Sequence, residues 1–64
     1  MKPFRIFHWD TFDNVTLFID ERDTFDEAEA LVQERYKGRI AIEGADIVEI
    51  VTDKGAVVKM YRVK

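Results

Sequence analysis

The fold is decided by residues 24–38, TFDEAEALVQERYKG, because this segment combines several independent helix signals. Thr24 occupies the N-cap position and Glu27 follows three residues later, which is the spacing of a capping box. In that arrangement the Thr24 hydroxyl accepts from the Glu27 N–H, and the Glu27 carboxylate reaches back to the Thr24 N–H. Acidic residues crowd the first turns and basic residues the last, as the helix dipole favours. Gly38 is suited to the left-handed position that ends a helix.

One side of this predicted helix is apolar and the other is acidic and polar. The apolar residues recur at helical spacing and form one stripe: Phe25, Ala28, Leu31, Val32 and Tyr36. We expect this stripe to pack on a core and the opposite side to face water. The sequence therefore predicts a helix over about residues 24–37 with one buried face.

Four other segments have the composition of β-strands: residues 4–9, 15–19, 45–52 and 56–63. Turn residues 10–14 join the first pair and residues 53–55 the second, so each pair is expected to form a hairpin. The order β-β-α-β-β predicts one α+β domain over residues 1–64, with two layers: a four-stranded, mainly antiparallel sheet and the helix on one face. The third strand is the most continuously apolar, which favours the order 2-1-3-4. The alternative order places the second and fourth strands in the middle.

Two connecting segments lie outside these elements. Residues 20–23 form a charged connector into the helix. In residues 39–44, Ile40 and Ile42 alternate with other residues, and two interpretations remain open. The segment is either a short extended piece at the sheet edge or a loop held by two buried isoleucines.

Length and composition exclude several classes of site. The chain has 64 residues, a formal net charge of −3, one histidine and no cysteine, so it can form neither disulfides nor thiolate metal sites. Such a small domain buries a limited core and often gains stability from a partner chain. No apolar run reaches the roughly 18 residues of a membrane span, and the N-terminus lacks the pattern of a secretory signal. We therefore expect a soluble cytoplasmic protein that does not bind membranes.

No catalytic or cofactor motif is present, which predicts that the chain is not an enzyme and binds no cofactor. His8, Asp10 and Asp13 are the one cluster with metal-ligand chemistry, but their spacing matches no metal signature. The favoured interpretation is a histidine in the sheet beside carboxylates that cap a turn, so no metal site is predicted.

The candidate binding residues are aromatic and basic. A single helix covers one face of the sheet, and we expect the other face to display a mixed surface that includes Arg5, Phe7, Trp9, Phe18, Lys59 and Tyr61. This surface is interpreted first as an interaction site, for a second copy or a small protein partner. A homodimer would also enlarge the small core. Partly exposed apolar surface without a role is the plainest interpretation.

The alternative function is weak binding of single-stranded nucleic acid on the same face. Aromatic rings beside Arg and Lys can stack bases and hold phosphates. The last strand is basic and the helix is acidic, so the helix is not expected to contact phosphate. The absence of a nucleic-acid-binding motif and the net negative charge favour the protein interaction.

Overall fold

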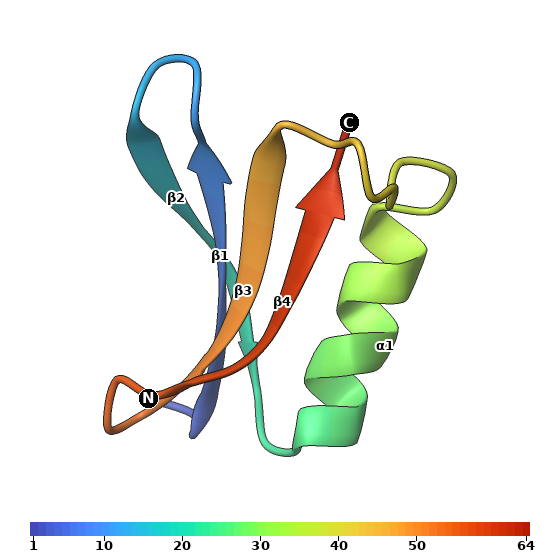
Figure 1. The fold of residues 1–64 in the computed structure, drawn as a ribbon. Helices are drawn as coiled ribbons and strands as arrows, with labels where there is room; N and C mark the ends of the chain where they lie inside the picture. Colours follow the sequence, from blue (N-terminus) through green and yellow to red (C-terminus); the bar gives the residue numbers. More distant parts are fainter.

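The computed structural model describes residues 1–64 and contains four strands and one helix in the order β-β-α-β-β (Figure 1). The elements are β1 (Phe4–Asp10), β2 (Val15–Arg22), α1 (Phe25–Arg35), β3 (Asp46–Thr52) and β4 (Val57–Val63). All four strands belong to one open sheet, and α1 packs on one side of it. The predicted two-layer α+β fold is therefore confirmed.

The strands are antiparallel and lie in the order β2-β1-β3-β4. This confirms the order favoured from the sequence, and the alternative with the second and fourth strands in the middle is wrong. The strongly apolar β3 lies inside the sheet, where its residues can be covered on both sides by neighbouring strands. Consequently β2 and β4 form the two edges.

Each edge strand contains one irregularity in its pairing. Phe7 pairs with Phe18 but Ile6 pairs with Asp20, so Ile19 is an extra residue in β2. Val58 is the extra residue in β4, because Ile50 pairs with Lys59 and Val51 with Val57. An extra residue bends a strand and changes the alternation of its side chains. As a result, Ile19 packs against the core on the helix side.

The start of α1 follows the capping prediction with one change. The Thr24 hydroxyl accepts from the Glu27 N–H at 3.1 Å, as expected. The Glu27 carboxylate accepts from the Thr24 hydroxyl at 3.0 Å, whereas we expected it to bind the Thr24 N–H. The helix ends at Arg35 with Tyr36 as C-cap, two residues before the predicted end. Gly38 then turns the chain with a φ of 77°, and the Arg39 N–H donates to the Tyr36 carbonyl.

The core lies between α1 and the side of the sheet that faces it, and its strand residues come from β1, β3 and β4. It contains eight buried apolar residues: Ile6, Ala28, Val32, Tyr36, Val48, Ile50, Tyr61 and Val63. Phe25 and Leu31 are half-buried and pack against this cluster. The predicted apolar stripe of the helix is therefore confirmed, with Leu31 at its margin.

The charged connector is shorter than predicted, because Asp20, Glu21 and Arg22 belong to β2. A strand at the edge of a sheet can carry charged residues, since one of its sides remains in water. An ion pair of 2.8 Å joins Arg22 Nη1 to Asp20 Oδ2 at this end of the strand.

Residues 39–45 form a loop along the end of β4. Ile40 makes a single bridge to Val63, but Ile42 is 92% exposed, so the prediction of two buried isoleucines is wrong. The alternative expectation, a short extended segment at the sheet edge, agrees with the structure only at Ile40. The loop is held by its backbone: the Ala41 N–H donates to the Arg62 carbonyl and the Lys64 N–H to the Arg39 carbonyl.

Candidate functional site

The candidate site is the helix-free face of the sheet, which no other element covers. Directly opposed residues of neighbouring strands share a face, so the strand register defines its members. Three rows cross the sheet: Glu21, Arg5, Val51 and Val57; Phe18, Phe7, Glu49 and Met60; Thr16, Trp9, Ile47 and Arg62. Each row therefore contains both apolar and charged residues.

Four of the six residues predicted for this surface lie on it together: Arg5, Phe7, Trp9 and Phe18. The rings of Phe7 and Phe18 meet edge to face, with their centroids 5.8 Å apart. Trp9 is half-buried, and its Nε1 donates to Asn14 Oδ1 at 3.2 Å. Phe7, Trp9 and Phe18 thus lie on one face of β1 and β2, and we call these three residues the aromatic cluster.

The other two residues, Lys59 and Tyr61, lie on the helix side, so their predicted position on the helix-free face is wrong. Both residues bind Glu29 of α1 through its Oε2, Lys59 Nζ at 2.5 Å and the Tyr61 hydroxyl at 3.2 Å. Tyr61 is buried because its ring joins the core while its hydroxyl reaches the polar margin. The alternation of side chains along β4 correctly places Lys59 and Tyr61 on the same side of the strand. It does not identify which side of the strand the helix covers.

Several residues of the face were missed from the sequence, mainly on β3 and β4: Ile47, Glu49, Val51, Met60 and Arg62. The available signal was the alternation of β3, in which Val48 and Ile50 point to the core. Once those two residues are assigned inward, their neighbours must point outward. The same rule then assigns Met60 and Arg62 through their pairing with Glu49 and Ile47.

The charges of the helix-free face are balanced and unpaired. Arg5 lies opposite Glu21, Arg62 and Glu49 lie on the same face, and none of the four belongs to an ion pair within the chain. Arg5 Nε is shielded from solvent and has no hydrogen-bond partner. A shielded N–H without an acceptor is unfavourable, so this face retains an unused donor.

Electrostatics on the helix side centre on Glu29. The hydrogen bond from Lys59 is the main cause that lowers the pKa of the Glu29 carboxyl, although partial burial acts in the opposite direction. Burial, followed by the hydrogen bond to Glu29, raises the pKa of the Tyr61 hydroxyl from 10.0 to about 12. The acidic helix and the basic β4 are therefore joined by a direct contact.

We expect the free energy of unfolding to decrease as the pH rises from about 10 to about 12. The unfolded chain releases the Tyr61 proton near 10.0, while the folded chain keeps it until about 12, so ionisation favours the unfolded state. The difference corresponds to roughly 2–3 kcal/mol. Urea denaturation at a series of alkaline pH values measures it. Tyr61→Phe should lose this part of the pH dependence, and equal pH dependence in both proteins would contradict the assignment.

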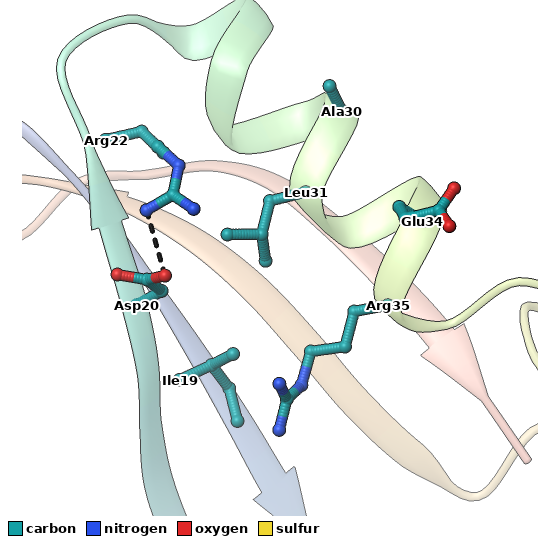
Figure 2. A pocket seen from close by; sticks show the side chains of 7 residues that line it. All are labelled: Ile19, Asp20, Arg22, Ala30, Leu31, Glu34 and Arg35. Carbon is teal, nitrogen blue, oxygen red and sulfur yellow. Dashed lines mark ion pairs between the residues drawn. The ribbon is translucent and has the colours of Figure 1, made fainter.

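A groove lies on the helix side between α1 and β2 and encloses about 510 Å³ (Figure 2). Figure 2 shows Ile19 and Leu31 pointing toward one another across it, with Arg35 extending toward Ile19 and Glu34 turned away. The Asp20–Arg22 ion pair lies at its other end. The middle of the groove is therefore apolar and both ends are charged.

His8 is engaged on both ring nitrogens. Its Nδ1 lies 2.8 Å from the Tyr36 hydroxyl, and its Nε2 lies 2.9 Å from Asp46 Oδ2. The hydrogen bond from His8 is the main cause that lowers the pKa of the Asp46 carboxyl. This network connects β1, β3 and the end of α1, and it leaves neither nitrogen of His8 available for a ligand.

The side-chain hydrogen bonds of Asp10 are confined to the turn in which Asp10 and Asp13 lie. Asp10 Oδ1 accepts from the N–H groups of Phe12 and Asp13 and so caps the turn between β1 and β2. No group of three or more potential ligands is arranged around a metal-sized site. The interpretation of Asp10 as a turn-capping carboxylate and of His8 as a sheet histidine therefore agrees with their observed contacts.

Comparison with protein-family models, with curated proteins and with solved structures finds no match to this chain. The one helix also lacks the length and apolar character needed to cross a membrane. The geometry of the helix-free face is therefore the basis for a functional proposal.

Proposed function

We propose that the chain is a non-enzymatic interaction module, located in the cytoplasm, that binds a second copy of itself through the helix-free face. The observation that supports this most directly is the exposure of large apolar side chains there. Phe18, Val57 and Met60 are 54%, 51% and 55% exposed, respectively, on a face that no other element covers. Contact with a second copy would remove this apolar surface from water.

The charges of the face suit contact between identical surfaces. In a two-fold contact each patch meets the same patch of the other copy. A face with two arginines and two glutamates can then pair opposite charges, whereas a face of one sign would repel itself.

The energetic reason is the small size of the domain. Burial of apolar surface contributes about 25 cal/mol per Å². Small folded domains are stable by only about 5–15 kcal/mol in total, so a second copy can add a substantial share. Self-association would thus supply the additional stability that disulfides or metals supply in other small domains.

Binding of single-stranded nucleic acid is less well supported than it was from the sequence. Lys59 and Tyr61 lie on the opposite face, and Lys59 is paired with Glu29. The cations that remain on the face of the aromatic cluster are Arg5 and Arg62, and the same face carries two carboxylates, Glu21 and Glu49. Phosphate groups would therefore meet no net positive charge on this face.

Met60→Glu tests the proposal, because Met60 is half-exposed in the single chain and its replacement places a charge on the helix-free face. We expect the wild type to sediment above 7.5 kDa at micromolar concentration and Met60→Glu to sediment at a lower mass. The emission of Trp9, the single tryptophan, should shift to shorter wavelength as the wild type associates.

Ile42→Glu is the matched control, because Ile42 is exposed and lies in the loop beside β4, away from this face. It should associate like the wild type. Equal masses for Met60→Glu and the wild type would overturn the proposal, as would a wild type that remains monomeric.

A further inference from the structure

The two edges of the sheet differ in how their backbones are covered. The outer side of β4 is bridged by Ile40 at Val63, and the Arg62 carbonyl accepts from the Ala41 N–H. Lys59 adds a charge to the same strand, which is a common protection of sheet edges. By contrast, β2 pairs only with β1, and no backbone hydrogen bond joins its outer side to another segment.

The open part of β2 is its first half. In the second half, both backbone polar groups of Glu21 are hydrogen-bonded to neighbouring side chains. The Glu21 N–H donates to Asp20 Oδ1 at 2.8 Å, and the Glu21 carbonyl accepts from Arg22 Nη1 at 2.7 Å. Residues 15–18 carry no charge, and all four are exposed. An uncharged edge strand with unpaired backbone groups is a template for another strand.

Apolar side chains project from both faces of this half. Val15 and Leu17 pair with Asp10 and His8 and so lie on the helix side, where α1 does not reach them. Val15 is 45% and Leu17 is 52% exposed, and Phe18 is exposed on the other face. An added strand would cover residues on both faces at once, which neither a helix nor a second sheet packed on one face can do.

We propose that β2 pairs with β2 of a second copy, antiparallel about a two-fold axis at Leu17, so that two sheets of four strands become one sheet. Val15 of each copy then lies opposite Ile19 of the other, and Thr16 lies opposite Phe18. This register keeps side chains on matching faces, because Val15 and Ile19 are on the helix side while Thr16 and Phe18 are on the helix-free face. Beyond Ile19, Asp20 and Glu21 would meet Asn14 and Asp13, so the pairing ends there.

The groove between α1 and β2 explains why the added strand is a second copy of β2. Its apolar middle is formed by Ile19 and Leu31 (Figure 2). The axis at Leu17 brings Val15 of the other copy beside Ile19, at the open side of this groove. The strand β2 thus carries an exposed apolar residue, Val15, on one side of Leu17 and the apolar groove at Ile19 on the other side. A two-fold contact requires this complementarity, because Val15 of each copy then meets the groove of the other.

This contact is separate from the proposed contact through the helix-free face, and the two can occur together. Each is a two-fold contact, and two different two-fold contacts can build a tetramer. Wild type with both contacts would then sediment at roughly four times the chain mass of 7.5 kDa. Variants of Leu17 and of Met60 distinguish the two contacts, because Leu17 is on the helix side and Met60 is on the strand at the opposite edge.

Leu17→Cys gives a direct test because the chain has no cysteine of its own. Directly opposed residues of antiparallel strands have Cα atoms about 4.5–5.5 Å apart, within the range of about 4.4–6.8 Å that a disulfide spans. Under mild oxidation at micromolar concentration, we expect Leu17→Cys to form a covalent dimer at least about 100-fold faster than Ile42→Cys, because its thiols are already held together. Equal rates would overturn the proposal.

Leu17→Lys provides an independent measurement, since it places two positive charges on the axis. We expect it to halve the mass of the wild type, and Ile42→Lys to leave the mass unchanged. If Leu17→Lys keeps the wild-type mass while Met60→Glu lowers it, the β2 contact is wrong and the contact through the helix-free face stands. A wild type that is monomeric, or whose β2 amides gain protection only when another polypeptide is added, would also overturn the proposal.

Discussion

Ile6→Ala is expected to lower the free energy of unfolding by about 2–5 kcal/mol, the range for an aliphatic side chain truncated in a packed core. Ile6 is 0% exposed and lies in β1, one of the two inner strands. It pairs with Ile50 of β3, which is also fully buried, on the side that α1 covers. The removed atoms leave a cavity whose walls are held by strands on both sides, so the site cannot collapse easily.

Ile42→Ala makes the same chemical change at a position that is 92% exposed, and we expect it to change the stability by less than about 0.5 kcal/mol. Both variants are measured by urea denaturation followed by circular dichroism. Similar losses at the two positions would contradict the core described above. A chain this small could lose most of its folded population with Ile6→Ala, which Ile6→Val, expected to cost about 0.5–1.5 kcal/mol, would then quantify.

Gly44→Ala is expected to be the second severe substitution, because the buried Gly44 lies directly against the backbone of Val63. A Cβ atom at Gly44 would lie 2.5 Å from the Val63 carbonyl carbon and oxygen and 2.6 Å from its nitrogen. Val63 is held by Asp46 of β3 and by the bridge to Ile40, so it cannot move aside without loss of pairing. Relief of such overpacking typically costs about 1–3 kcal/mol, occasionally more.

Gly38→Ala separates this steric effect from the ordinary cost of replacing glycine. Gly38 has a φ of 77° and nothing near the position of an added Cβ, so alanine there meets only backbone strain, typically about 1–2 kcal/mol. We expect Gly44→Ala also to speed the exchange of the Ala41 and Lys64 amide protons, which join the loop to β4 and its end. Normal protection of both amides in Gly44→Ala would show that the loop tolerates the added atom.

The helix could be predicted because its signals are local. The cap, the dipole-matched charges and the apolar stripe all lie within residues 24–38, and each acts over a few residues of backbone. The strands and their order also followed from composition and turn residues, because short loops favour hairpins between consecutive strands. These parts of the fold agree with the structure to within three residues at their ends.

The contacts of His8 could not be predicted, because its partners are far away in the sequence. Tyr36 is 28 and Asp46 is 38 residues from His8. No spacing rule relates such residues, and they meet only because β1 pairs with β3 while the end of α1 lies over both. The need for glycine at position 44 arises in the same way, from the close approach of the loop to β4.

By itself, the sequence determined the helix, the four strands, their order and the presence of apolar residues on both faces of the sheet. Only the tertiary structure decided which face the helix covers, and therefore that Lys59 and Tyr61 bind Glu29 while Phe7 and Trp9 remain on the other face. The physical reason is that a side chain with an apolar body and a polar tip fits a core margin as well as an open surface. Its place depends on a partner in another element, and alternation along one strand carries no information about that partner.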